Sequence, residues 1–398
     1  MLFSIALIVL LGLLVRWLCE KLTIPSLLGY LVLGILLGPA VFNLLDQGLL
    51  AASGDIRQVI LIIILTRAGL SLNLKELKRV GRPAFLLSFL PATFEILGTM
   101  LLAPLFFDLT LPEAALLGAV LGAVSPAVVV PRMIQLIRGG YGTEAGIPQM
   151  LLAGSSLDDI YALVLFASFL SIVEHGGSFH LTQLFAVPAA ILGGLLVGGL
   201  VGMGLSIFFT RFLKDSLWQV LVMLAISMLF MTLEQALGDL PFSGILAVMA
   251  MALALYRYVP EVSEPINRIY NKLWLPGEIF LFVLVGASVN ISYATKAGWT
   301  PIFLILGVLA VRMVGVWLSV TGTPLTLRER AFCLFGYMPK ATVQAAIGGV
   351  PLAMGLPVGD LILTISVIAI LVTAPLGAFG IDLTYQHWLE KDPEKKAS

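Results

Sequence analysis

The chain has 398 residues, of which 59% are hydrophobic and 12% charged, and its formal net charge is zero. Its mean hydropathy of +1.04 lies well outside the range of soluble domains. So hydrophobic a chain has too few polar residues to cover a soluble globule, and its balanced charge gives no reason to expect a nucleic-acid partner. The composition therefore predicts an all-α polytopic membrane protein.

About thirteen apolar segments of spanning length, at roughly 20 residues each, follow one another along the chain. We expect spans at 2–18, 25–45, 55–73, 82–106, 112–137, 147–173, 183–211, 217–237, 242–256, 273–290, 299–320, 328–354 and 360–386. The first has no basic n-region or A-x-A-like cleavage site, so we interpret it as a retained span. The two cysteines, Cys19 and Cys333, lack the spacing of a disulfide framework or a metal site.

Basic residues gather on alternate connections between these spans. Eighteen of the 23 Lys and Arg residues follow odd-numbered spans, whereas the opposite side holds only Arg57 and Lys296. Because cytoplasmic loops carry the excess of Lys and Arg, we expect an outside N-terminus and a cytoplasmic C-terminus. The expected location is the cell inner (plasma) membrane, with many passes through it.

Several short motifs recur at nearly constant separation. The segment 69-GLSLN-73 is similar to 286-GASVN-290, 217 residues later, and the same shift carries Glu95 onto Arg312. Further on, 124-VSPAVVVP-131 faces 337-YMPKATVQ-344 at a shift of 213. The alternative is chance similarity between short Gly- and Asn-containing stretches. If the repeat is real, the shift covers seven spans, and an odd number of spans makes the second copy run through the bilayer upside down.

Inverted-topology repeats are typical of secondary transporters, whose sites lie near the bilayer midplane at interrupted helices. Each motif of the second pair carries a mid-span proline, which removes a backbone donor, and irregular backbone at that depth is tolerated beside a protein-lined cavity. We therefore expect two broken helices that cross near the centre. The expected organisation is a single transmembrane transporter unit over 1–398, with a first inverted repeat at 1–174, a linking helix at 175–215, a second inverted repeat at 216–388 and a short cytoplasmic tail at 389–398.

Few ionisable residues fall inside the expected spans. Six of them, three acids and three bases, form the intramembrane set: Arg67, Glu95, Asp158, Asp159, Arg312 and Lys340. Charges inside a membrane are costly and usually face the protein interior, paired with one another. Two interpretations stay open for Arg67, Glu95 and Arg312, namely ion pairs that lock helices together and charge compensation at a transport site.

The adjacent pair Asp158 and Asp159 favours a transport site. Neighbouring residues on a helix point about 100° apart, so one aspartate can face a base while the other faces a cavity. Burial and a nearby carboxylate favour the protonated form of a carboxyl group, which can then exchange its proton for a cation. Ser155, one turn before Asp159, and the backbone freed near Val124 and Ser125 offer further oxygen ligands of the kind that hard cations prefer. Such a site holds either a proton or a cation.

The residues 155-SSLDDI-160, 124-VSPAVVVPRM-133 and 339-PKATVQAAIGG-349 resemble those of the cation/proton antiporters, and are closest to the sodium/proton branch with a double-aspartate motif. The segment 66-TRAGLSLN-73, with Glu95 and Arg312, is similar to bacterial and animal members, and the resemblance covers nearly the whole chain. It implies a thirteen-helix homodimer, with a six-helix core domain beside a dimerisation domain, and elevator-like alternating access. Asp159 would bind the cation or proton, with Asp158 its neighbour.

This sequence departs from the family pattern at two positions. Electrogenic members often have Lys at the position of Arg312, paired with the first aspartate, and many relatives have an acid at the position of Ser125. Arginine stays protonated in proteins, so Arg312 cannot carry a proton. Either Arg312 pairs with Glu95 and leaves Lys340 to balance Asp158, or Arg312 itself holds Asp158. These departures leave the stoichiometry open, and we lean toward electroneutral exchange.

The sequence thus predicts a secondary antiporter that exchanges Na⁺ or Li⁺ for H⁺ and serves pH homeostasis. Its partners would be the monovalent cation, protons, membrane lipids and a second copy of the chain, with no cofactor beyond the transported ions. The alternatives are K⁺/H⁺ antiport and a sodium-coupled organic-anion symporter of related fold. An intramembrane aspartyl protease needs two aspartates on different helices, and paired opposite charges would plug a channel, so neither is favoured.

Overall fold

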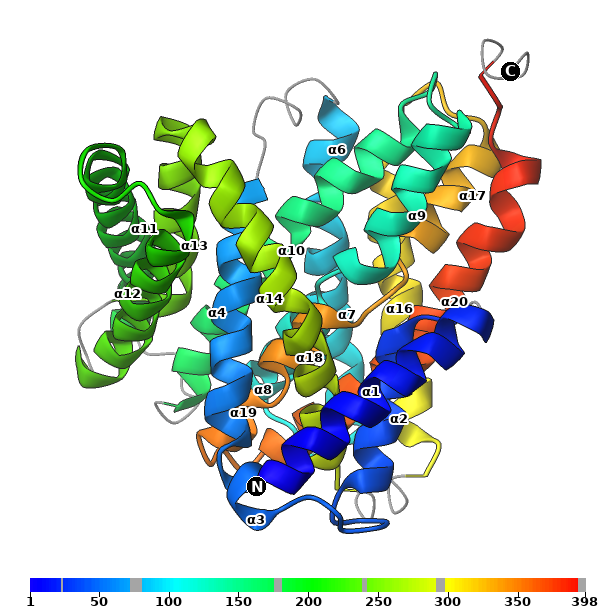
Figure 1. Ribbon diagram of the computed structural model, residues 1–398. Coiled ribbons are helices and arrows are strands. Elements are labelled where there is room, and N and C mark those ends of the chain that lie inside the picture. Colours follow the sequence, from blue (N-terminus) through cyan, green and yellow to red (C-terminus); the bar gives the residue numbers. More distant parts are fainter. Residues whose placement is uncertain (23, 72–80, 175–180, 238–241, 291–297, 393–398) are drawn as a thin grey trace. The chain divides into compact units, whose positions relative to one another are not determined.

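The computed structural model describes residues 1–22, 24–71, 81–174, 181–237, 242–290 and 298–392. Its helices, drawn in Figure 1, are α1 (Leu2–Leu22), α2 (Ser26–Leu37), α3 (Gln47–Ala51), α4 (Ser53–Ser71), α6 (Arg82–Leu87), α7 (Leu90–Phe106), α8 (Leu111–Leu121), α9 (Pro126–Gly139), α10 (Ile147–Glu174), α11 (Leu181–Arg211), α12 (Ser216–Leu237), α13 (Gly244–Tyr258), α14 (Pro260–Ala287), α16 (Thr300–Ser319), α17 (Leu327–Gly336), α18 (Thr342–Ile347), α19 (Val350–Ala353) and α20 (Gly359–Trp388). The all-α prediction is confirmed. Asn73 of the first repeat motif and residues 393–398 of the tail lie outside the described residues.

Within the described residues, nine helices are long and apolar enough to cross a membrane. Shorter apolar helices occupy two other expected spans, since α2 has 12 residues and α13 has 15. The count of thirteen spans stays a prediction. One expected loop is instead helical, because α14 begins at Pro260 rather than near residue 273. Proline is well tolerated in the first turn of a helix, so the basic residues Arg268 and Lys272 lie on α14 and not in a connection.

The chain divides into two compact units. The first contains residues 1–50, 73–169 and 282–398, and the second contains residues 51–72 and 170–281. Each unit is therefore built from segments that are far apart in the sequence. The boundaries of the expected repeats, 1–174 and 216–388, remain a proposal.

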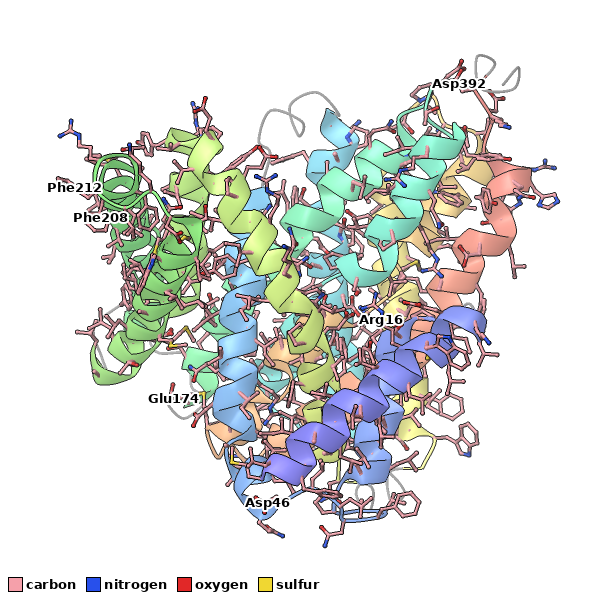
Figure 2. The ribbon with its side chains drawn as sticks, viewed as in Figure 1. Arg16, Asp46, Glu174, Phe208, Phe212 and Asp392 are labelled. Atoms are coloured by element: carbon pink, nitrogen blue, oxygen red, sulfur yellow. The ribbon has the colours of Figure 1, made fainter. Side chains whose placement is uncertain are left out.

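The second unit packs α4, α11 and α12 around α13, with α11, α12 and α13 drawn in green in Figure 1. Glycines bring α11 and α13 close, because a Cβ at Gly198 or Gly202 would overlap the backbone of α13. Small residues of this kind allow close helix contacts in membrane proteins. At the end of α11, the ring centroids of Phe208 and of Phe212, the residue after the helix, lie 5.8 Å apart, and both side chains are exposed. Figure 2 labels both residues. Apolar side chains thus cover the surface of this unit as well as its interior.

In the first unit, α7 packs between α8 and α16. Gly118 of α8 meets the backbone of α7, and Gly98 of α7 meets Val311 of α16. This close packing places Glu95, on α7, beside both neighbouring helices at 1% exposure. The arrangement brings a buried acid from the first half of the chain against Arg312 from the second.

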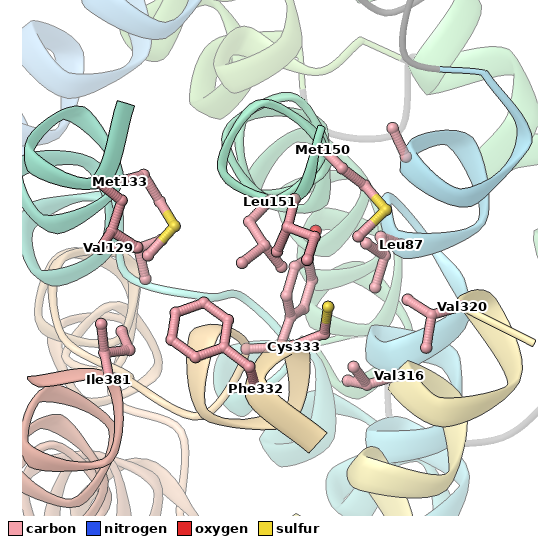
Figure 3. Packing of buried hydrophobic residues seen from close by; sticks show 14 of the residues in the cluster. Leu87, Val129, Met133, Met150, Leu151, Val316, Val320, Phe332, Cys333 and Ile381 are labelled. Carbon is pink, nitrogen blue, oxygen red and sulfur yellow. The ribbon is translucent and has the colours of Figure 1, made fainter. Parts of the chain in front are cut away.

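A buried apolar cluster lies beside the broken helices of the same unit. Figure 3 shows side chains from α6, α9, α10, α16, α17 and α20 in this cluster, among them Leu87, Val129, Met133, Met150, Leu151, Val316, Val320, Phe332, Cys333 and Ile381. Leu389 joins it from the segment after α20. That segment is also held by backbone hydrogen bonds, since Gly142 N donates to Glu390 O at 2.7 Å and Asp392 N donates to Gly140 O at 2.8 Å. The cluster fixes α9 and α17 against α20.

Candidate functional site

Two helices of the first unit are interrupted where the sequence predicts. The first break separates α8, which ends at Leu121, from α9, which begins at Pro126. The second separates α17, which ends at Gly336, from α18, which begins at Thr342. Ser125 N donates to Pro339 O at 2.8 Å, so the two non-helical segments contact each other through their backbones. The expectation of two broken helices that meet is confirmed.

The first break releases three successive carbonyl groups from helical hydrogen bonding, and each finds a side-chain donor. Lys340 Nζ donates to Leu121 O at 2.6 Å and Gln344 Nε2 to Ala123 O at 2.8 Å. Arg312 Nη1 donates to Gly122 O. Because the carboxyl end of a helix carries partial negative charge, cationic donors suit this position. All three donors come from the second half of the chain.

Arg312 is fully buried, and besides Gly122 O it bonds three further groups. Its Nε donates to Tyr337 O at 3.0 Å, its Nη1 lies 2.6 Å from Glu95 Oε2, and its Nη2 lies 3.1 Å from Asp158 Oδ2. A planar guanidinium suits this forked arrangement. Lys340 Nζ lies 2.6 Å from Glu95 Oε1. The geometry therefore places Arg312, and not Lys340, within hydrogen-bond distance of Asp158, while Glu95 is shared by both bases.

The two adjacent aspartates of α10 have different surroundings. Asp158 is fully buried; its Oδ2 accepts both the Arg312 bond and the Val124 N–H at 2.9 Å, while its Oδ1 has no hydrogen-bond partner among the described residues. Asp159 is 7% exposed, and within the described part of the chain its Oδ1 has no hydrogen-bond partner. The structure thus separates a carboxylate held by protein donors from one that is available to an ion.

The hydroxyl groups expected near this pair also differ. Ser125 Oγ is buried and, among the residues described, has no hydrogen-bond partner. Ser155 Oγ donates to the carbonyl of Leu152 at 3.1 Å, which leaves its lone pairs available. Hydroxyl oxygens such as these, as ligands, suit a hard monovalent cation better than a soft metal.

Arg67, the remaining base of the sequence prediction, belongs to the second unit. Its Nε donates to Asn271 Oδ1 at 2.8 Å, and its guanidinium carbon lies 5.1 Å from the centre of the Trp274 ring. Both partners lie on α14 within that unit. The contacts of Arg67 are therefore those of a side chain that packs α4 against α14.

Two residues of the network are absent from the sequence prediction. Gln344 bonds the first break, and Thr373 Oγ1 of α20 accepts the backbone N–H of Lys340 at 3.0 Å. Gln344 belongs to the motif 337-YMPKATVQ-344, so its place in that motif was an available signal. Thr373 has no such signal, since its contact depends on how α20 packs against the break.

Apolar helices that are interrupted and meet around buried, paired charges define a secondary active transporter. Residues 5–385 match the family described as "Sodium/hydrogen exchanger, transmembrane". The chain belongs to the sodium/hydrogen exchanger family, whose members are transporters rather than enzymes. Its relatives include Sodium/hydrogen exchanger 9B2 of Homo sapiens, 35% identical over 381 residues that cover 92% of this chain and 70% of that protein. Sodium/hydrogen exchanger 9B1 of Homo sapiens is 32% identical over 364 residues, which make up 86% of this chain and 68% of that protein.

A likeness to solved structures supports the same fold. The sodium proton antiporter MjNhaP1 from Methanocaldococcus jannaschii at pH 8 superposes with a TM-score of 0.80, at 23% identity, over 96% of this chain and 97% of that one. A second structure of the same antiporter, from electron microscopy, gives a TM-score of 0.74 at 22% identity. At this level of identity the similarity establishes the architecture alone.

Proposed function

We propose that this protein exchanges Na⁺ or Li⁺ for H⁺ at Asp159. The observation that carries the proposal is the contrast within the pair: the Oδ1 atoms of both aspartates have no partner in the described part of the chain, but Asp158 is held through Oδ2 by two protein donors, one of them Arg312. A carboxylate without protein donors binds either a proton or a cation, and the two compete. Ser125, Ser155 and the backbone near Val124 would complete the oxygen shell.

The charges around the site favour electroneutral exchange. Glu95 and Asp158 match Arg312 and Lys340 in number, and the four are joined by ion pairs of 2.6–3.1 Å. Of the three buried acids Glu95, Asp158 and Asp159, Asp159 is then the one that has no matching base in the described network. Since either one H⁺ or one Na⁺ neutralises it, the loaded site has the same charge in both directions of transport. Exchange of one cation for one proton moves no net charge.

The proposal extends to the setting of the transporter. We infer elevator-like alternating access by a homodimer in the cell inner (plasma) membrane, with the N-terminus outside, the C-terminus cytoplasmic, and a role in pH homeostasis. The division of the chain into two compact units supports a transporter with one part that moves and one that stays fixed. The bias of Lys and Arg toward one side of the expected spans supports the orientation.

The direct test is transport in proteoliposomes that carry a pH gradient. Addition of Na⁺ or Li⁺ should collapse the gradient, and Asp159→Asn should abolish the response because a neutral amide cannot exchange a proton. Asp382→Asn is the matched control, since Asp382 is 44% exposed and pairs with Arg132 away from the aspartate pair. The apparent KM for Na⁺ should rise as pH falls, because protons compete for the carboxylate. Full activity in Asp159→Asn would overturn the site assignment.

Two further arms of the same assay address the alternatives. A response to K⁺ as large as that to Na⁺ would make the protein a K⁺/H⁺ antiporter. Sodium-driven uptake of an organic anion without proton movement would make it a symporter. Comparing rates at valinomycin-clamped and unclamped voltage tests the stoichiometry, and equal rates are expected for electroneutral exchange.

A further inference from the structure

Among the three donors to the first break, Gln344 is the neutral one. It lies on α18 and is fully buried. Its Nε2 donates to Ala123 O at 2.8 Å and to Leu121 O at 3.3 Å, so both amide hydrogens are used across the contact between the broken helices. Leu121 O also accepts Lys340, whereas Gln344 is the donor found for Ala123 O among the side chains described. Gln344 therefore holds a carbonyl that the charged residues do not hold.

The position of that carbonyl links Gln344 to the aspartate pair. The peptide bond of Ala123 supplies the Val124 N–H, which donates to Asp158 Oδ2 at 2.9 Å. The next residue, Ser125, donates its N–H to Pro339 O and carries the buried hydroxyl without a partner in the described chain. Fixing Ala123 O therefore fixes the orientation of the Ala123–Val124 peptide, which presents the Val124 N–H and directly precedes Ser125. If the amide were removed, Ala123 O would be a buried acceptor without a donor, which is unfavourable enough to drive rearrangement.

The neutrality of Gln344 has its own consequence. A third cation at this position would add charge to a group in which Glu95 and Asp158 already match Arg312 and Lys340. An amide donates hydrogen bonds to the negative end of α8 without changing that balance. With a neutral Gln344, Asp159 remains the carboxylate that gains and loses the proton or the cation during exchange.

We propose that Gln344 is a positioning residue of the cation site. Its amide holds the segment Ala123–Ser125 in the conformation in which Val124 N–H meets Asp158 and Ser125 Oγ lies available to the cation. The assignment of Ser125 and Asp159 to the ion rests on the proposed antiport function, whereas the effect of Gln344 on the conformation of the segment does not.

The transport test compares Gln344→Leu and Gln344→Glu with Gln219→Leu. Gln219 is a matched control because it is buried in the second unit and its Nε2 donates to Leu213 O at 2.6 Å. Gln344→Leu should raise the apparent KM for Na⁺ by about tenfold, the equivalent of losing these hydrogen bonds, with a smaller change in maximal rate. Gln219→Leu should leave KM within about twofold of the parent value.

Gln344→Glu separates positioning from a general loss of packing. A protonated carboxyl group can donate one hydrogen bond to Ala123 O, whereas a carboxylate can donate none. The ratio of its KM to that of the parent, at matched pH, should therefore fall toward one as pH is lowered. A purely structural defect would give a ratio that does not change with pH. This variant also keeps the test open if Gln344→Leu does not fold.

A readout that is independent of transport follows the segment itself. Ser125→Cys, in a background with Cys19 and Cys333 replaced by alanine, places a thiol at a buried position. Its rate of labelling by a membrane-permeant thiol reagent should rise by about fivefold or more when Gln344→Leu is added, because local opening exposes buried groups. Faster labelling with no cation exchange by the parent chain would refute the proposed function and leave the positioning role standing. Unchanged labelling together with an unchanged KM in Gln344→Leu would overturn the positioning role.

Discussion

The two broken helices share a pattern in the sequence but differ in the side chains that they bring to their contact. The first break offers acceptors, which are the carbonyls of Leu121, Gly122 and Ala123. The side chains that bond these carbonyls come from the second broken helix, since Lys340 lies in its break and Gln344 lies on α18. One backbone hydrogen bond runs in the other direction, from Ser125 N to Pro339 O. The same division extends to the helices around them: Glu95, Asp158 and Asp159 belong to the first half of the chain, and Arg312 belongs to the second.

This difference explains how two similar segments can meet at the centre of the protein. Copies related by an inverted repeat bring equivalent positions toward each other, so charges of the same sign in both copies would repel strongly in a low dielectric. With acids in one half and bases in the other, the same proximity becomes attractive. Glu95 and Arg312, which are equivalent in the proposed repeat, lie 2.6 Å apart as an ion pair. Substitutions at these residues disturb this division, and removal of the Arg312 guanidinium should have the largest effect.

Arg312→Met should be the most destabilising of these changes. It removes the donor shared by Glu95, Asp158, Tyr337 O and Gly122 O, and it leaves Asp158 buried without a base. Breaking a buried pair in this way costs about 3–5 kcal/mol. The measurement is the Tm in detergent of the parent and the variant.

The control for this change is Arg132→Met on α9. Arg132 pairs with Asp382 at 2.9 Å, but that carboxylate is 44% exposed. Exposed pairs contribute about 0–1 kcal/mol, so the Tm should change little. Equal loss of Tm in the two variants would contradict the distinction between the central network and the partly exposed pair.

Glu95→Gln and Lys340→Gln should each be destabilising but should not add. Each single change leaves an unmatched charge in the buried network, whereas the double variant removes one acid and one base together. Lys340 Nζ lies 2.6 Å from Glu95 Oε1, and directly contacting residues typically show coupling of about 0.5–3 kcal/mol. A double-mutant cycle on Tm or on denaturant stability measures this coupling. Additive effects would mean that the two side chains do not act as a pair.

Gly377→Ala and Gly122→Ala compare the packing of the two breaks. A Cβ at Gly377 of α20 would lie 2.5 Å from Pro339 Cδ, whereas the nearest atom to a Cβ at Gly122 would be Gly118 O at 3.2 Å. Gly377→Ala should therefore cost about 1–3 kcal/mol through overpacking and should move Pro339 O away from Ser125. Gly122→Ala should cost less than about 1 kcal/mol. Thermal denaturation of both variants, with transport assays beside it, checks the order, and the reverse order would contradict it.

The sequence predicts the breaks and most of the buried charges, because each has a local signal. A mid-span proline marks each break, and a charge in an apolar segment is conspicuous wherever it faces. The choice between Arg312 and Lys340 as the partner of Asp158 could not be predicted, since a forked guanidinium can bond two acids at once and its rotamer depends on packing. Gln344 escaped notice because a neutral amide in a span is not conspicuous.

The start of α14 shows the opposite error. The basic residues near Arg268 and Lys272 suggest a connection, yet the helix runs through them from Pro260. Charged side chains are compatible with a helix whose polar face is solvated, so charge alone does not end one. The same helix continues through Pro265 and Pro276, so a proline alone does not end a helix either.

Ser125→Ala should have the smallest effect on stability and still a clear effect on transport. Ser125 Oγ is buried and has no hydrogen-bond partner in the described part of the chain, so its removal breaks no hydrogen bond of that group. Stability should stay within about 0.5 kcal/mol of the parent. If the hydroxyl is a ligand of the transported cation, the apparent KM for Na⁺ should nevertheless rise severalfold while the maximal rate changes less. Thr99→Val is the control, because its hydroxyl donates to Glu95 O at 2.8 Å within α7 and should affect stability more than KM. A Ser125→Ala variant with unchanged KM for Na⁺ and Li⁺ would remove the Ser125 hydroxyl from the ion's oxygen shell and leave Asp159, Ser155 and the backbone near Val124 to bind it.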